Sequence, residues 1–259
     1  MSKLQQRLSR ELQQNSSVKI VATNNWCMPI RTVEVTYEPI RRSKMDVFMT
    51  MLLISIQEAD MRSAEDLSEL LLVDPLFAED LVTLMTRVRL LEKVEGYYRL
   101  TAKGENQLAL GIFEEELKVA SSSLLYSPCH KDFLKGDLES LEEHDELPEP
   151  FRYVDEKEES RVTFEDALLI EALKAMAADD EDERVEAVAS EAAQTIISSI
   201  ISAEATQIND IPCHEFIVYD KEQDILYARI WNTLTDRWDK ELEQQLTTRE
   251  QLQWRAKYL

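Results

Sequence analysis

The chain has 259 residues, of which 44% are hydrophobic, so it can bury a substantial core in one large domain or two ordinary ones. It contains only four glycines, which argues against glycine-rich phosphate loops and against a sheet protein dense with tight turns. We therefore expect an α+β fold that is dominated by helices.

Charge is strongly unbalanced, with 51 acidic residues against 29 basic ones and a net charge of −22. Most of the excess lies between Asp137 and Glu191, where 21 acidic residues stand against 5 basic ones. Such a surface repels nucleic-acid phosphates and attracts basic proteins, more strongly at low salt. Two interpretations stay open for this acidic tract: a surface that binds a basic partner, or an ordinary solvated face.

The three cysteines are odd in number and far apart, which predicts neither a disulfide framework nor a zinc motif. No apolar run approaches the roughly 18 residues of a membrane span, and the first residues lack the apolar stretch of a secretory signal. We expect a cytoplasmic protein that makes no membrane contact and holds no cofactor.

Residues 1–42 are predicted to form an arm and a strand. Leucines at positions 4, 8 and 12 suit a short amphipathic helix, which would be either a docking arm or a frayed terminus. The alternating, β-branched stretch Thr32–Tyr37 predicts a strand that Pro39 ends.

Residues 43–118 are predicted to form a separate domain that begins with three helices. The first has a broad buried face made of Val47, Phe48, Met51, Leu52 and Ile56. Ser63 opens a capping box for the second helix, and Asp74 followed by Pro75 starts the third. Apolar residues of the third helix recur every three or four positions, from Phe77 to Leu91.

A hairpin about Glu95-Gly96 and a fourth helix capped by Thr101 are predicted to follow. The order of helix, helix, turn, helix, hairpin, helix is typical of the winged helix-turn-helix. In addition, Leu90-Leu91-Glu92-Lys93 with the segment from Gly96 to Gly104 resembles the wing of bacterial winged-helix regulators. The resemblance covers about residues 43–117 and implies a winged-helix domain, a fold that serves both DNA readers and protein-interaction modules.

The remaining chain is predicted to form an acidic, proline-containing connector (119–160) and an acidic α+β C-terminal domain (161–259). A strand is expected at Ser121–Tyr126, and a helix after a capping box that Thr163 begins. A second helix is predicted over Val185–Ile201 and a hairpin from Phe216 to Trp231. Regularly spaced apolar residues predict a closing helix: Leu234, Trp238, Leu242 and Leu246.

The predicted third helix has an unfavourable charge for reading DNA. Its early exposed positions offer Glu79, Asp80 and Thr83, and carboxylates are disfavoured between phosphate-lined walls. Around the hairpin the balance reverses, because five cations outnumber two glutamates there. These cations are candidate contacts to DNA phosphates or to a partner: Arg87, Arg89, Lys93, Arg99 and Lys103.

Candidate catalytic residues are few. The dipeptides Cys129-His130 and Cys213-His214 offer four zinc ligands, but adjacent strand residues point to opposite faces and the spacing matches no zinc motif. A Cys-His nucleophile pair at Cys129 would have no evident oxyanion site. We predict no catalytic and no metal site, and keep a Cys/His-dependent hydrolase only as the third alternative.

Aromatic residues gather near the end of the chain, where core packing is their usual role. Trp254 and Tyr258, which lie among basic residues, are predicted partner contacts.

We predict a non-enzymatic accessory or regulatory subunit that binds a protein, itself basic or bound to DNA, in a DNA-handling assembly. The alternative is a winged-helix DNA-binding transcription regulator, whose wing grips phosphates while the C-terminal domain dimerises or senses a ligand. The sequence leaves open whether the chain contacts DNA directly and whether it forms homo-oligomers.

Overall fold

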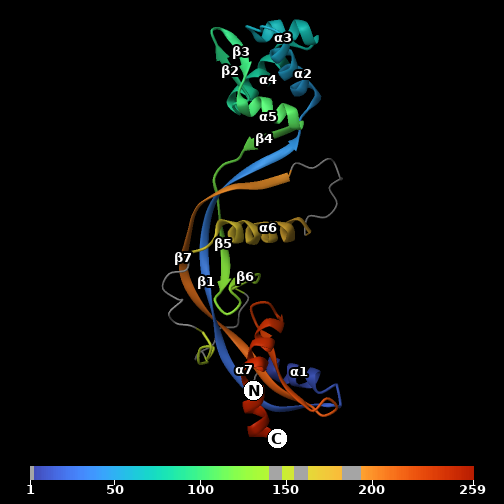
Figure 1. The fold of residues 1–259 in the computed structure, drawn as a ribbon, viewed down its shortest axis with the longest axis vertical. Coiled ribbons are helices and arrows are strands. Elements are labelled where there is room, and N and C mark those ends of the chain that lie inside the picture. Colours follow the sequence, from blue (N-terminus) through green and yellow to red (C-terminus); the bar gives the residue numbers. More distant parts are fainter. Residues whose placement is uncertain (1–2, 140–147, 155–162, 183–193) are drawn as a thin grey trace. The chain divides into compact units, whose positions relative to one another are not determined.

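The computed structural model describes residues 3–139, 148–154, 163–182 and 194–259 (Figure 1). The described residues form two compact units, each assembled from separate stretches of the chain. The first unit comprises Met1–Val35, Ser122–Asp179 and Ser202–Leu259. The second comprises Thr36–Ser121 and Asp180–Ile201. Two long strands, β1 (Val18–Lys44) and β7 (Gln194–Asp220), contribute residues to both units.

The predicted fold class is wrong, because the fold is not dominated by helices. Strand and helix are present in proportions of 40% and 37%, and the two longest elements are strands of 27 residues, β1 and β7. The predicted fold of a winged-helix domain followed by a separate C-terminal α+β domain is wrong as well. Strand β1, near the start of the chain, pairs with β7, near its end, so one antiparallel sheet unites the two ends of the sequence (Figure 1).

Two local patterns misled the prediction. Pro39 does not end β1, because it lies where the neighbouring strand passes from β4 to β5, and its carbonyl accepts a hydrogen bond from the Leu117 N–H at 2.9 Å. Of the helix predicted over Val185–Ile201, residues 185–193 lie outside the described residues and residues 194–201 belong to β7. The β-branched isoleucines there fit a strand better than a helix.

Among the described residues, seven strands form the main sheet in the order β6-β5-β1-β7-β8-β9, with β4 also beside β1. The other strands are β4 (Ile112–Glu116), β5 (Ala120–Ser127), β6 (Asp132–Leu134), β8 (Ile225–Asn232) and β9 (Arg237–Trp238). Two sequence predictions are confirmed: β5 is the strand expected at Ser121–Tyr126, and β7 pairs with β8 as the expected hairpin, with register from Asp220↔Ile225 to Cys213↔Asn232.

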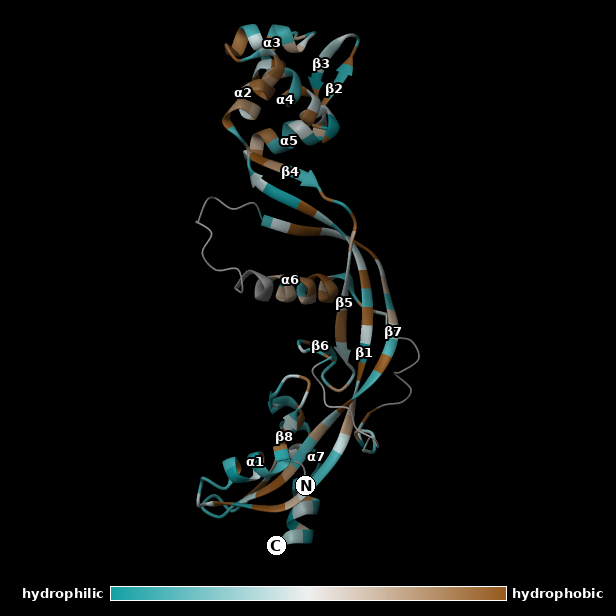
Figure 2. Cartoon of the chain, turned by 180° about the vertical axis from the view of Figure 1, so that it is seen from behind, coloured by the Kyte–Doolittle hydropathy of each residue, from teal (hydrophilic) through white to brown (hydrophobic). Residues whose placement is uncertain are grey.

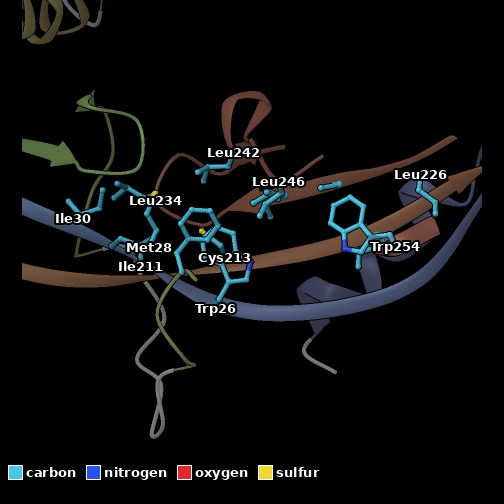
Figure 3. Packing of buried hydrophobic residues seen from close by; sticks show 14 residues of the cluster. Trp26, Met28, Ile30, Ile211, Cys213, Leu226, Leu234, Leu242, Leu246 and Trp254 are labelled. Atoms are coloured by element: carbon cyan, nitrogen blue, oxygen red, sulfur yellow. The ribbon is translucent and has the colours of Figure 1, made fainter. Parts of the chain in front are cut away.

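Helices cover both faces of the β7–β8 hairpin in the first unit. Alternate residues of a strand point to opposite faces. Ile217 accordingly packs in the core beneath α7 (Lys240–Tyr258), and Phe216 packs against Leu8 of α1 (Lys3–Leu12). Figure 3 shows the first of these cores, with side chains from β1, β7, β8 and α7. The predicted N-terminal helix is thus confirmed, and the closing helix begins only after Asp239, its N-cap, so that Trp238 lies in β9 instead.

Helix α6 (Asp166–Asp182), most of which belongs to the first unit, begins near the expected capping box. It buries Leu169 and Leu173, as its spacing predicted. Just before it, the Phe164 ring meets Tyr126 of β5 edge-on, at a centroid distance of 5.0 Å.

The second unit contains a helical module that follows the predicted order of elements. It consists of α2 (Val47–Glu58), α3 (Ala64–Leu71), α4 (Pro75–Arg87), the hairpin β2 (Leu91–Val94) with β3 (Tyr97–Leu100), and α5 (Ala102–Leu110). The predicted caps are confirmed: Ser63 and Asp66 form a capping box, and Asp74 and Thr101 cap α4 and α5. Gly104 has a steric role, because a Cβ atom there would lie 2.2 Å from the Leu90 carbonyl oxygen.

Candidate functional site

Helix α2 is apolar on two sides. Its inward side contributes the fully or nearly fully buried residues Leu52, Leu53 and Ile56 to the core of the helical module. Its outward side exposes four further apolar residues, by 43% to 66%: Val47, Phe48, Met51 and Ile54. The sequence prediction that Val47, Phe48 and Met51 are buried is therefore wrong. A helix that is apolar all round is normally covered all round, so the outward side of α2 is suited to contact another molecule.

The first turn of α4 extends this exposed face. Asp74 accepts hydrogen bonds from the Leu76 and Phe77 N–H groups at 2.9 and 3.4 Å, which fixes the start of the helix. Leu76 is 71% exposed, and the Phe77 ring meets the Phe48 ring edge-on at a centroid distance of 5.3 Å. We call the exposed residues of the two helices the α2–α4 apolar surface: Val47, Phe48, Met51, Leu76 and Phe77. Figure 2 shows the hydrophobic colouring along α2.

The stretch of sequence that contains this surface is rich in carboxylates, and all of them are exposed. Residues 46–80 contain nine aspartates and glutamates against one basic residue, Arg62. Arg62 is itself engaged, since its guanidinium donates to the Tyr97 hydroxyl. Hydrogen bonds from the backbone N–H groups of Arg62 and Ser63 lower the pKa of the exposed Asp66 carboxyl. The helical module therefore presents apolar side chains in a negative field, which suits a protein partner and opposes a phosphate backbone.

The early positions of α4 match the sequence prediction. Glu79, Asp80 and Thr83 are exposed, and they follow the exposed Leu76 and Phe77. A helix that enters a DNA groove presents early residues that donate to base edges and phosphates. The beginning of α4 offers acidic and apolar side chains instead.

The five predicted cations lie around the hairpin, but most of their charge is already paired. Arg99 lies 2.6 Å from Asp60, Lys103 lies 3.1 Å from Glu116, and Arg87 lies 3.6 Å from Glu115. Lys93 lies over the Tyr98 ring at 4.8 Å. Arg89 is exposed and lies two residues after α4 ends. These internal pairs reduce the positive charge that the hairpin can offer to phosphates.

A partly buried ion network in the first unit was not foreseen: Arg152 is exposed, and both of its carboxylate partners are buried. Arg152 donates to both carboxylate oxygens of Glu215, at 2.8 and 3.1 Å, and to Glu250 at 2.5 Å. Two indole N–H groups complete the network: Trp26 donates to Glu215 at 2.8 Å and Trp254 to Glu250 at 3.0 Å. Glu215 is fully buried, so its charge depends on these donors.

The same network holds a short segment of chain against β1. The Cys27 N–H donates to the Glu149 carbonyl, and the Phe151 N–H donates to the Cys27 carbonyl, both at 2.8 Å. Phe151 stacks on Trp26 at a centroid distance of 4.4 Å. Arg152 therefore anchors this segment to the sheet. The sequence contained one indication of this network: Glu215 is a carboxylate directly before the apolar residues Phe216–Tyr219 of a predicted strand.

A cavity of about 400 Å³ lies beside this network and is lined by both aromatic residues that were predicted to contact a partner, Trp254 and Tyr258. Trp254 is only 4% exposed and belongs to the core, whereas Tyr258 is half-buried. Arg152 and Glu250 also line the cavity, and the Arg152 guanidinium there is already shared between Glu250 and Glu215. Contact between these aromatic residues and a partner stays a prediction.

Ser127, His130 and Asp239 form a hydrogen-bonded chain in the first unit. The Ser127 hydroxyl lies 2.7 Å from His130 Nδ1, and His130 Nε2 lies 3.1 Å from both Asp239 carboxylate oxygens. These residue types form the triad of many hydrolases. Here Ser127 is fully buried, and Asp239 also caps α7 by accepting from the Leu242 N–H at 3.2 Å. The arrangement therefore supports a structural role.

The surroundings of the two Cys-His dipeptides disfavour the thiolate form of both cysteines. Burial raises the pKa of the Cys129 thiol to about 12, and it also raises the pKa of Cys213. Thiolate, the nucleophilic form, is then scarce near neutral pH. The histidines have separate partners: His130 contacts Asp239, and His214 lies 2.9 Å from the Asn25 amide oxygen.

Two carboxylates of the first unit, Asp239 and Glu250, predict that the stability of the protein is sensitive to acid. Burial raises the pKa of Asp239, but hydrogen bonds from His130, Asn232 and the Leu242 N–H outweigh it, so the pKa is lowered overall. Burial also raises the pKa of Glu250, but Arg152, Tyr153 and Trp254 together outweigh it, so this pKa is lowered overall as well. A lowered folded-state pKa gives stability that is complete above the unfolded value, about 4, and is lost as the pH falls through the folded value.

We therefore expect urea unfolding midpoints that are level from pH 7 to about 5 and fall steeply below about 4. Asp239→Asn should flatten part of this fall, whereas Asp132→Asn, at an exposed carboxylate, should leave it unchanged. An unfolding midpoint that does not respond to acid in the wild type would contradict this assignment.

Among the described residues, no helix is both long and apolar enough to cross a membrane. Comparisons of the chain with protein-family models, with curated proteins and with solved structures found no match.

Proposed function

We propose that this chain is a non-enzymatic accessory or regulatory subunit that binds a protein partner through the α2–α4 apolar surface. One observation carries the proposal: α2 buries one apolar side in its own module and exposes a second one, which Phe77 of α4 extends. An exposed apolar patch of this kind is typical of protein-interaction sites.

The charge around the surface narrows the chemistry of the partner. Nine exposed carboxylates in residues 46–80 favour a partner that sets lysines and arginines around an apolar centre. Proteins that handle DNA carry basic surfaces, so we propose that the subunit acts within a DNA-handling assembly. Direct DNA binding by the hairpin is less well supported, because Arg87, Arg99 and Lys103 are paired with carboxylates.

Phe48→Asp and Phe77→Asp are expected to weaken partner binding at least tenfold each, because central aromatic residues carry much of the energy of an interface. The wild type would be captured from its native host, its stoichiometric partner identified by mass analysis, and the affinity of the purified pair measured. Leu252→Asp, at an 83% exposed leucine of the first unit, is the matched control and should bind as the wild type does.

Two results would count against the proposal. One is a chain that is recovered alone under gentle conditions. The other is the result expected for the alternative, a DNA-binding regulator. In that case the wild type retards duplex DNA strongly near physiological salt, the double variant Arg99→Glu/Lys103→Glu abolishes the retardation, and Phe48→Asp leaves it unchanged.

A further inference from the structure

The first part of strand β7 has one edge that no described strand covers. On one side it pairs with β1, and the Ser198 hydroxyl donates to the Glu38 carbonyl on that side at 3.0 Å. On the other side it pairs with β8, but only from Cys213 to Asp220. Within the described residues, the backbone donors and acceptors of the first part of β7 therefore face outward along this second edge (Figure 1).

The open edge lacks the features that usually prevent strand pairing. Natural edge strands carry charged residues, prolines or bulges that prevent pairing with other chains. Residues 194–203 read QTIISSIISA, with no charged residue, proline or glycine, in a chain in which 31% of residues are charged. Ile201 is 53% exposed on this segment. An edge of this composition is expected to be paired in the native protein, because open edges of this kind aggregate.

The sequence of the segment is symmetric about its two serines. Residues 196–201 read Ile-Ile-Ser-Ser-Ile-Ile, which is the same in both directions. On one face of the strand the order is isoleucine, serine, isoleucine, and on the other face it is the same. Two copies related by a two-fold axis pair antiparallel, and a residue at the axis then lies opposite itself. Because paired residues share a face, the axis must lie on a residue and not between the two serines. With the axis at Ser199, Ile197 lies opposite Ile201 of the second copy on one face of the sheet. On the other face, Ser198 lies opposite Ile200 and Ile196 lies opposite Ser202.

We propose that two copies of this chain join through the β7 edge, residues 194–203, as an antiparallel pair centred on Ser199. The pairing gives the outward backbone groups their hydrogen bonds and covers the exposed Ile201. It is also closed, because each copy uses the same edge segment on the other, and this limits growth to a dimer. The proposal is independent of the α2–α4 apolar surface.

Sedimentation equilibrium over a concentration series tests the proposed dimer. The measured mass is expected to be twice that of the 30.1 kDa chain. In Ile197→Lys/Ile201→Lys, like charges lie opposite each other, and the dissociation constant should rise at least tenfold. In Ile197→Lys/Ile201→Glu, opposite charges face each other across the axis, and the dimer should return at low salt and weaken as salt is added.

The matched control is Ile208→Lys, at a 58% exposed position of the same strand outside the symmetric segment, which should remain a dimer. Far-UV circular dichroism and thermal unfolding verify that each variant is folded. A wild type that stays monomeric at every concentration overturns the proposal. So does a dimer that survives the two lysines, or one that the lysine–glutamate variant fails to restore.

Discussion

Arg152→Ala is expected to lower the free energy of unfolding by about 2–3 kcal/mol, because it leaves the buried Glu215 carboxylate without its cation. The loss is smaller than for a fully buried ion pair because Arg152 is itself exposed. Arg152 is the only cation that the described contacts place against Glu215, and Glu215 is fully buried. Without it, Glu215 keeps one donor, the Trp26 indole, and Glu250 loses its closest one. The segment that Phe151 and Arg152 hold against β1 should detach with it.

Urea unfolding followed by tryptophan fluorescence measures this effect, since Trp26 and Trp254 belong to the network. Arg249→Ala, at a neighbouring exposed arginine that lies over Tyr153, is the control and should change stability by less than about 0.5 kcal/mol. Adding Glu215→Gln to Arg152→Ala should restore part of the loss, because a neutral amide needs no cation. An Arg152→Ala protein as stable as the wild type would refute the role of this network.

Trp254→Ala is expected to cost about 3–5 kcal/mol, as is usual when a buried tryptophan is removed. The side chain is 4% exposed, packs among residues of β1, β7, β8 and α7, and donates to Glu250 (Figure 3). Leu252→Ala, two residues away and 83% exposed, should change stability by less than about 0.5 kcal/mol. Unchanged stability in Trp254→Ala, measured by urea unfolding, would mean that Trp254 serves a partner and not the core.

The parts of the fold that sequence predicted well depend on neighbouring residues. Ser63, Asp74 and Thr101 cap their helices because a short polar side chain reaches backbone N–H groups two or three residues ahead. The hairpin turn at Glu95-Gly96 is another such signal, since both residues take positive φ angles, 52° and 86°, that the turn requires.

The parts of the fold that could not be predicted from the sequence depend on residues far apart along the chain. Nothing near β1 indicates that its partner is β7, about 175 residues later, so the length of both strands was hidden. Charge composition likewise showed Arg152 in an acidic tract, but not that it lies against Glu215 and Glu250. Pairing across such separations is a property of the whole fold, and local patterns do not encode it.

The candidate site was missed for a different reason. The spacing of apolar residues in α2 indicated a broad apolar face, and the prediction assigned all of it to the core. A helix of this small module can bury only one side, so Leu52 and Ile56 turn inward while Phe48 and Met51 remain exposed. The sequence showed the cations near the hairpin but not the carboxylates that pair with them, because these come from other elements: Asp60 after α2, and Glu115 and Glu116 of β4.

Photo-crosslinking in the native host tests the central claim most directly, with a photoreactive phenylalanine analogue in place of Phe48 or Phe77. A discrete adduct with one protein is expected from either position, and none from the analogue at Leu252. Adducts with DNA from Phe48 or Phe77, or protein adducts no more frequent than at Leu252, would contradict the proposal that this apolar surface binds a protein.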